Sequence, residues 1–241
     1  MTLSKDITVL SFSDSSMVDR NSSIIKVDSG WIVYSKNSES SILSFTSDGQ
    51  FSGYIGHRGN GPGEYTSVYD VVVNQKSKVL EVLSDGGIFC YTFGGDFLDK
   101  KEVTYPAFSF AIDDRQNYWF YVGNNTTYGD AKMICTDENI ANVAYYLHQK
   151  SNMLPMVENN FGRNGEWLTF HESLNHDLYT IENGKLDLSY AMDFPNYKLP
   201  KKLHELSGME VIEELQRSNY CLLYRSPSPR DPKTSRMPSS A

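Results

Sequence analysis

Hydrophobic residues recur along this chain in short runs separated by polar turns, and the whole pattern returns about every 45 residues. Three of the four turns carry Asp-Gly, Gly-Gly or Asn-Gly, which favour tight hairpins because these residues tolerate positive φ angles. Equivalent turn positions are Gly49, Gly95, Asn139 and Gly184. A repeat of this length is typical of a four-stranded propeller blade. The pattern therefore predicts an all-β fold, a β-propeller built of four-stranded antiparallel blades.

Each repeat is expected to form one blade. The blades are predicted at about residues 22–65, 66–104, 105–150 and 151–194. The second strand of each blade has large residues at its centre, and all three tryptophans, Trp31, Trp119 and Trp167, fall in such strands. We expect them to fill the space between neighbouring blades, which pack face to face. The fourth blade has only a weak first strand, near Met156–Glu158.

The pattern changes after the fourth blade. Residues Pro195–Leu203 look like the start of a fifth unit, and apolar spacing within Leu203–Arg217 predicts a short helix. Ser226–Ala241 contains four prolines and five serines with no aromatic residue, so composition predicts disorder. We interpret this tail as non-native. The partial propeller is therefore expected to span residues 1–225.

The most distinctive stretch, YIGHRGNGPGEYTSVYD, joins the first two blades over Tyr54–Asp70. The residues expected to shape this loop are Gly59, Gly61, Pro62, Gly63 and Tyr65. The candidate binding residues are His57, Arg58, Asn60 and Glu64. Arg58 offers a planar fork of donors to a carboxylate or phosphate. The alternative is that Arg58 and Glu64 pair, or bond to backbone, and only hold the loop in shape.

This loop also carries a resemblance to a known family. GHRGNGPGEY, followed by a β-rich run through Asp70 and Val71–Val73, resembles the six-bladed β-propeller proteins of Bacteroidetes, which are relatives of NHL-repeat propellers. The resemblance implies six blades, of which about four are present here as an open arc, truncated at the C-terminus. The first and fourth sheets would then each expose an apolar face. It also implies a lipoprotein-like protein of the periplasm or outer membrane.

Composition narrows the classes of partner. The formal net charge is −8, which disfavours nucleic acid because a nucleic-acid-binding face is basic. No apolar run approaches the ~20 residues that span a bilayer, and the N-terminus lacks the features of a signal peptide. The cysteines, Cys90, Cys135 and Cys221, are too few for a disulfide framework. Cys90 and Cys135 lie within strand patterns and are expected to be buried.

Candidate catalytic or metal-binding residues form no recognisable motif. His171 and His176 lack the spacing of a metal-binding helix, and no nucleophile elbow or phosphate-binding loop is present. Asp70, Asp85 and Asp113 stand near blade entries, where related propellers hold calcium or zinc in a central channel. Capping of turns and strand ends is the favoured interpretation for all three. No cofactor is predicted; calcium is compatible with the resemblance but has no motif.

These observations favour a non-enzymatic ligand- or protein-binding scaffold of the bacterial cell envelope, whose partner is an unidentified protein or carbohydrate. Large polar loops on a rigid ring suit binding. The alternative is a metal-dependent lyase or lactonase that acts at the propeller channel.

Overall fold

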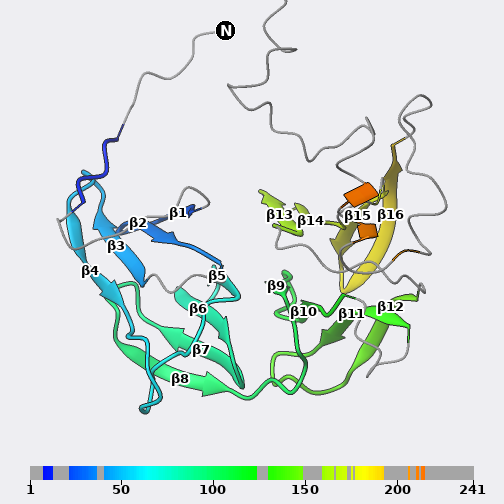
Figure 1. The fold of residues 1–241 in the computed structure, drawn as a ribbon, viewed down its shortest axis with the longest axis horizontal. Helices are drawn as coiled ribbons and strands as arrows, with labels where there is room; N and C mark the ends of the chain where they lie inside the picture. Colours follow the sequence, from blue (N-terminus) through cyan, green and yellow to red (C-terminus); the bar gives the residue numbers. More distant parts are fainter. Residues whose placement is uncertain are drawn as a thin grey trace, which may run out of the picture.

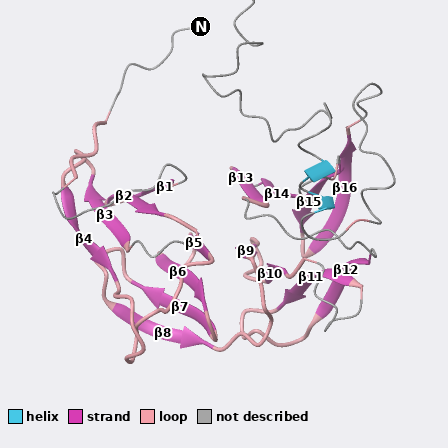
Figure 2. Ribbon diagram, in the orientation of Figure 1, coloured by secondary structure: helices cyan, strands magenta, loops and turns pink. Residues whose placement is uncertain are grey.

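The sheets of this protein form a four-bladed β-propeller arrangement. The structure is a computed structural model that describes residues 8–12, 22–36, 41–123, 130–148, 159–165, 167–172, 175, 177–192, 206, 210–211 and 213–214. Its strands form four antiparallel sheets of four strands, and within each sheet the strands follow one another in sequence order. Among the residues that the structure describes, Figure 2 shows almost no helix. The predicted fold class is confirmed.

The strands of the first two sheets are short and end at turns of two to five residues or at loops. The first sheet consists of β1 (Ser23–Val27), β2 (Gly30–Tyr34), β3 (Ile42–Thr46) and β4 (Phe51–Ile55). The second consists of β5 (Asp70–Asn74), β6 (Val79–Ser84), β7 (Gly87–Tyr91) and β8 (Phe97–Lys101). Both sheets have a register irregularity between their third and fourth strands, which strengthens the local twist.

The third and fourth sheets repeat this plan. The third consists of β9 (Ser109–Ile112), β10 (Tyr118–Tyr121), β11 (Ala131–Thr136) and β12 (Ala144–His148). The fourth consists of β13 (Phe161–Asn164), β14 (Trp167–His171), β15 (Asp177–Glu182) and β16 (Lys185–Ala191). The expected first strand of the fourth blade, Met156–Glu158, lies outside the described residues, and the strand that pairs with β14 is Phe161–Asn164. Because Gly162 and Arg163 interrupt the run of hydrophobic residues, the hydrophobic pattern does not indicate this strand.

Turn chemistry explains the hairpins, with one exception. Gly95 has a φ of +101°, and a Cβ atom there would lie 2.4 Å from the carbonyl oxygen of Tyr54, so only glycine fits. The turn between β11 and β12 contains no glycine. In this turn Ile140 and Asn142 have left-handed φ angles of 58° and 51°. The equivalence drawn between Asn139 and the glycines is therefore off by one residue.

The sheets lie around a common centre, with β1, β5, β9 and β13 innermost (Figure 1). Three apolar cores join consecutive sheets. Ile32 and Leu80 belong to the core between the first and second, Leu83 and Phe120 to that between the second and third, and Trp119 and Phe170 to that between the third and fourth. Among the described residues, no such core joins the fourth sheet to the first, and Figure 1 shows these two sheets facing each other across an opening. Four blades are therefore observed, and the expectation of six stays a prediction.

The outer faces of the first and fourth sheets, which have no neighbouring sheet among the described residues, differ in how far they are covered. On the first sheet, Val33, Leu43 and Phe45 pack with Leu10 and Phe51, so residues 8–12 cover part of this face. The backbone of Ser11 bonds to Gly49 beside them. Trp31 packs on this outer face as well, and on the fourth sheet Trp167 is 66% exposed, so the expected place between blades is wrong for both and is confirmed for Trp119. Trp167 begins β14 on the face turned away from the third sheet.

The predicted helix is seen only in part. Residues 210–211 and 213–214 are helical, and Val211 is buried. The remainder of Leu203–Arg217, apart from Leu206, and the tail Ser226–Ala241 lie outside the described residues. Within the described part of the chain, no helix has the length and apolar character needed to cross a bilayer.

Candidate functional site

The loop between the first two blades is anchored by Tyr65. This side chain is 1% exposed, its hydroxyl donates to the carbonyl of Ile55 at 3.3 Å, and it accepts from the backbone N–H of Ile42 at 3.3 Å. Its ring lies edge-on to Tyr91, whose hydroxyl donates to the carbonyl of Gly63 at 2.9 Å. The loop therefore packs across the seam between the two sheets.

Glu64 closes the loop on itself. Its carboxylate accepts from the backbone N–H of Gly61 at 2.8 Å. A Cβ atom on Gly59 would lie 2.0 Å from the same carboxylate, so the glycine makes room for it. Arg58 lies near the loop end, where its Nε donates to the carbonyl of Thr66 at 2.8 Å. These contacts agree with the interpretation in which Arg58 and Glu64 bond to backbone.

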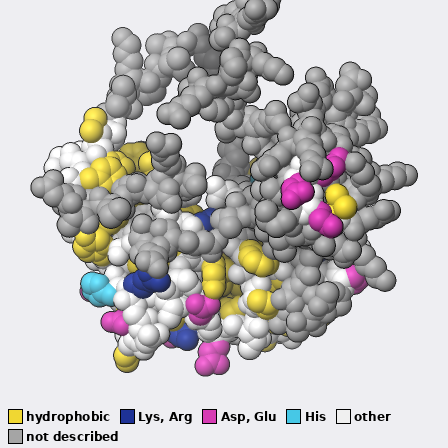
Figure 3. Space-filling view, in the orientation of Figure 1, with side chains coloured by type: hydrophobic (Ala, Val, Ile, Leu, Met, Phe, Trp, Pro, Cys, Tyr) yellow, Lys and Arg dark blue, Asp and Glu magenta, His cyan; other side chains and the backbone are white. Residues whose placement is uncertain are grey.

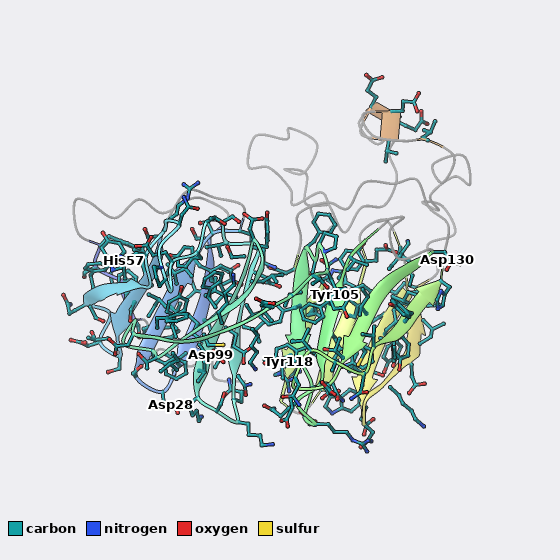
Figure 4. The ribbon with its side chains drawn as sticks, turned by 90° about the horizontal axis from the view of Figure 1, so that it is seen from below. Asp28, His57, Asp99, Tyr105, Tyr118 and Asp130 are labelled. Carbon is teal, nitrogen blue, oxygen red and sulfur yellow. The ribbon has the colours of Figure 1, made fainter. Side chains whose placement is uncertain are left out.

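The other candidate residues of the loop are open to solvent. His57, Arg58 and Asn60 are exposed, while Glu64 is half-buried. In Figure 4 His57 lies toward the same side as Tyr105 and Asp130, and Asp28, Asp99 and Tyr118 lie toward the other. A binding role for His57, Arg58, Asn60 and Glu64 stays a prediction.

Replacing Glu64 with alanine is expected to lower the free energy of unfolding by about 1–2 kcal/mol, because the N–H of Gly61 loses a charged acceptor. Urea unfolding followed by tyrosine and tryptophan fluorescence measures the change. Asn60→Ala is the matched control on the same loop and should stay within about 0.5 kcal/mol of the parent. Unchanged stability in Glu64→Ala would favour the binding role instead.

The centre of the molecule holds a hollow of about 1000 Å³. Residues of all four sheets line it, among them Ile24, Val72, Ile112 and Gly162. Figure 3 shows basic and hydrophobic side chains both reaching the surface near this centre. The inner strands present their unpaired edges here, so their backbone groups need other partners.

Asp70 satisfies several of these groups at the second blade. Its carboxylate accepts from the backbone N–H groups of Val71 at 2.9 Å and Phe110 at 3.1 Å, and it pairs with the ammonium of Lys36 at 2.7 Å. Burial raises the pKa of Asp70, while Lys36 and the two N–H groups act in the opposite direction. The same carboxylate contributes to the raised pKa of Tyr34, after burial itself. One side chain thus connects the first, second and third blades.

Asp113 caps a turn, as favoured from sequence, whereas Asp85 bonds to side chains that lie just before β5, so the capping interpretation is wrong for Asp85. Asp113 accepts from the backbone N–H groups of Arg115 and Asn117, both at 2.9 Å, and from the indole of Trp119 at 3.0 Å. Asp85 accepts three hydroxyl donors from Thr66, Ser67 and Tyr69. The hydrogen bond from Tyr69 is the main cause of its lowered pKa.

Two buried acidic groups lie in seams between blades. Glu81 accepts from Asn74 at 3.0 Å and from Tyr118 at 2.8 Å beside a hollow of about 490 Å³. Burial is the main cause of the raised pKa of Tyr118, and the negative charge of Glu81 is the second cause. The Tyr118 hydroxyl therefore keeps its proton and acts as a donor. Glu172 binds Lys132 across the next seam at 2.8 Å. All these carboxylates are engaged by the protein itself.

Metal ligands are not gathered at one place. Among the described residues, no three His, Cys, Asp or Glu side chains lie together as possible metal ligands. Desolvation lowers the pKa of His171, and His176 lies outside the described residues. Cys90 and Cys135 are buried and free, as predicted, and burial raises the pKa of each to about 12.

A smaller hollow of about 190 Å³ opens beside the central one, with Asp114 and Leu168 lining both. Trp167, Arg115 and Asn183 line it as well. Sequence reasoning missed this place because its parts come from three separate segments of the chain: the β9–β10 turn, the start of β14 and the end of β15 with its turn. The signals available were the tryptophan opening a strand and the Asn-Gly turn of the fourth repeat.

Solved structures share this fold. A protein of Bacteroides fragilis described as exported has a TM-score of 0.75 and 15% identity over 88% of this chain. A DUF4221-family member from Bacteroides vulgatus and a streptogramin B lyase each have a TM-score of 0.51, with 11% and 17% identity over 76% of this chain. The chain spans 63%, 61% and 58% of their respective lengths. At these identities the likeness shows the fold alone.

The propeller resemblance is thus supported, and six blades or NHL repeats in particular are not demonstrated. No curated protein matches the chain. A family model described as a domain of unknown function, DUF4934, matches residues 8–226, which is nearly the whole sequence. This protein therefore belongs to the DUF4934 family.

Proposed function

We propose that this protein is a non-enzymatic binding module of the bacterial cell envelope, and that it takes its ligand in the central hollow. The observation that carries the proposal is a space of about 1000 Å³ lined by residues of all four sheets. Ligand sites are concave, largely preformed and of about this size. Loops on a rigid scaffold complete such sites.

The state of the charged groups favours binding over catalysis. A general acid or base must reach the substrate with a proton to give or a lone pair to use. At this hollow, Asp70 and Asp113 instead hold strands and turns through several hydrogen bonds each. They shape the wall of the hollow and fix its electrostatics.

The envelope location rests on similarity. Two of the similar structures come from Bacteroides, and one of them is described as an exported protein. A periplasmic or outer-membrane-associated protein meets saccharides, peptides and partner proteins rather than nucleic acid. The net charge of −8 agrees with such partners.

Filling the hollow is expected to abolish binding. Ile24 lines it and is 59% exposed, so Ile24→Trp adds volume there without disturbing a core. Thermal unfolding with a library of sugars, dipeptides, amino acids and nucleotides should show a compound that stabilises the parent. Ile24→Trp should lose at least tenfold in affinity for it. Val9→Trp, an equal enlargement at a 69% exposed site, is the control.

The metal-dependent lyase or lactonase alternative makes the opposite prediction. Each compound that binds is incubated with the protein and Ca²⁺, Mg²⁺ or Zn²⁺, and products are followed by mass spectrometry. Turnover that a chelator abolishes and the metal restores would replace the binding module with an enzyme. A library without any binder would end the proposal of a ligand site in the central hollow.

A further inference from the structure

The smaller hollow lies where turns of the third and fourth blades meet. It has a volume of about 190 Å³. Its walls come from the β9–β10 turn, the start of β14 and the end of β15 with its turn: Asp114, Arg115, Trp167, Leu168, Thr180, Ile181, Glu182 and Asn183. Because Asp114 and Leu168 also line the central hollow, the two spaces are neighbours.

Trp167 gives this hollow a flat apolar wall. Its neighbours in β14, Leu168 and Phe170, belong to the core with the third sheet, whereas Trp167 is 66% exposed. Trp119, in the second strand of the third blade, is by contrast fully buried. An exposed indole offers a large, rigid apolar surface with a polar N–H, as aromatic side chains at binding sites do. An indole face suits the C–H face of a sugar ring.

Planar polar groups also line the hollow. The guanidinium of Arg115 donates to the amide oxygen of Asn183 at 3.3 Å, and that of Arg163 donates to Asp114 at 3.2 Å. Glu182 adds a second carboxylate. Arg163 lies outside the lining but neutralises Asp114 as an ion pair, so the remaining charges of the lining, Arg115 and Glu182, balance, which favours a neutral ligand. Together with the amide they supply both donors and acceptors, as adjacent sugar hydroxyls require.

The polar rim is built on fixed turns. Asp113 holds the β9–β10 turn through the N–H groups of Arg115 and Asn117 and through the indole of Trp119. In the β15–β16 turn, Asn183 and Gly184 take left-handed φ values of 55° and 73°. A Cβ atom on Gly184 would lie 3.2 Å from the amide nitrogen of Asn117, so the two turns are close. Such preorganisation lowers the entropy lost on binding.

We propose that this hollow, the Trp167 pocket, is a subsite for one neutral pyranose ring that stacks on the indole. Its volume suits a single ring, and the rest of a longer saccharide would continue past Asp114 into the central hollow. The inference rests on the proposed binding function and names its ligand class. It assigns Trp167 as the stacking platform and Arg115, Glu182 and Asn183 as partners for hydroxyls.

The test measures sugar binding to the full chain by isothermal titration calorimetry. The probes are D-glucose, D-galactose, D-mannose, N-acetyl-D-glucosamine and the β-linked disaccharides of each, with adenosine as a flat ligand lacking the pyranose ring. At least one sugar should bind, and Trp167→Ala should weaken it tenfold or more. Tyr190→Ala removes another exposed aromatic of the fourth sheet, outside the pocket, and should change nothing. Thermal unfolding of both variants should match the parent.

Tryptophan fluorescence tests whether the sugar ring lies against the indole of Trp167. The sugar should shift the emission of the parent to the blue and protect it from acrylamide, and the same sugar should do neither in Trp167→Phe. Sugar binding that Trp167→Ala leaves intact would overturn the inference and keep the binding function. Binding of adenosine or of a library compound, without binding of any sugar, would likewise overturn the inference and keep the binding function. If nothing binds in either experiment, both proposals fail.

Discussion

Lys132→Met is expected to lower the free energy of unfolding by about 3–5 kcal/mol, because it leaves a carboxylate buried without its cation. The ammonium of Lys132, 2% exposed, lies 2.8 Å from Glu172, whose side chain is 10% exposed. Tyr121 donates to the same carboxylate at 2.8 Å and would be its remaining hydroxyl partner. These groups join β10 and β11 of the third blade to the end of β14, so the seam between the two blades should weaken.

Urea unfolding at equilibrium measures this change. Lys78→Met is the matched control, since Lys78 and Asp28 form an ion pair at 3.0 Å with both side chains largely exposed. Such a surface pair contributes little, and the control should unfold like the parent. Adding Glu172→Gln to Lys132→Met should recover much of the loss, because the uncompensated charge is gone. A single variant as stable as the parent would show that the pair does not hold the seam.

Asp70→Asn is expected to cost a similar amount, about 3–5 kcal/mol, and for a related reason. The substitution keeps the shape of the side chain but removes the negative charge beside Lys36, and both side chains are less than one-tenth exposed. An amide also turns an N–H₂ group toward one of the backbone donors of Val71 and Phe110. Three blades meet at this residue, so the loss should reach beyond one hairpin.

Asp28→Asn is the control for this variant, because its carboxylate is 79% exposed. Thermal and urea unfolding should leave the control unchanged. Hydrogen exchange should show faster exchange at the start of both β5 and β9 in Asp70→Asn. If only β5 were affected, Asp70 would be a local cap and not a link between blades.

Much of the propeller could be predicted from local sequence. A blade is one meander of four strands, so its turns and hydrophobic runs return at a fixed distance and appear in the sequence as a period. Gly49 and Gly95 mark hairpins because φ angles of +88° and +101° are costly for other residues. Where Ile140 takes such a position without a glycine, the pattern placed the turn one residue early.

One feature of the loop around Glu64 could also be inferred from residues close together in the sequence. Its contacts to Gly61 and beside Gly59 lie within a few residues, so the sequence could indicate that the loop holds its own shape. It also drew attention to this loop as the binding site, because glycines and charges are concentrated there. Whether the loop binds a ligand depends on partners that local sequence does not contain.

The sequence by itself determined the fold class, the repeat length, the burial of Cys90 and Cys135 and the capping role of Asp113, because each depends on residues near one another in the chain. Only the tertiary structure decided which face of a sheet meets a neighbour. Trp119 and Trp167 both belong to the second strand of a blade, yet one is buried and the other is 66% exposed. The Trp167 pocket has the same origin: Arg115 and Asn183 meet because two blades pack side by side, and no local pattern carries that contact.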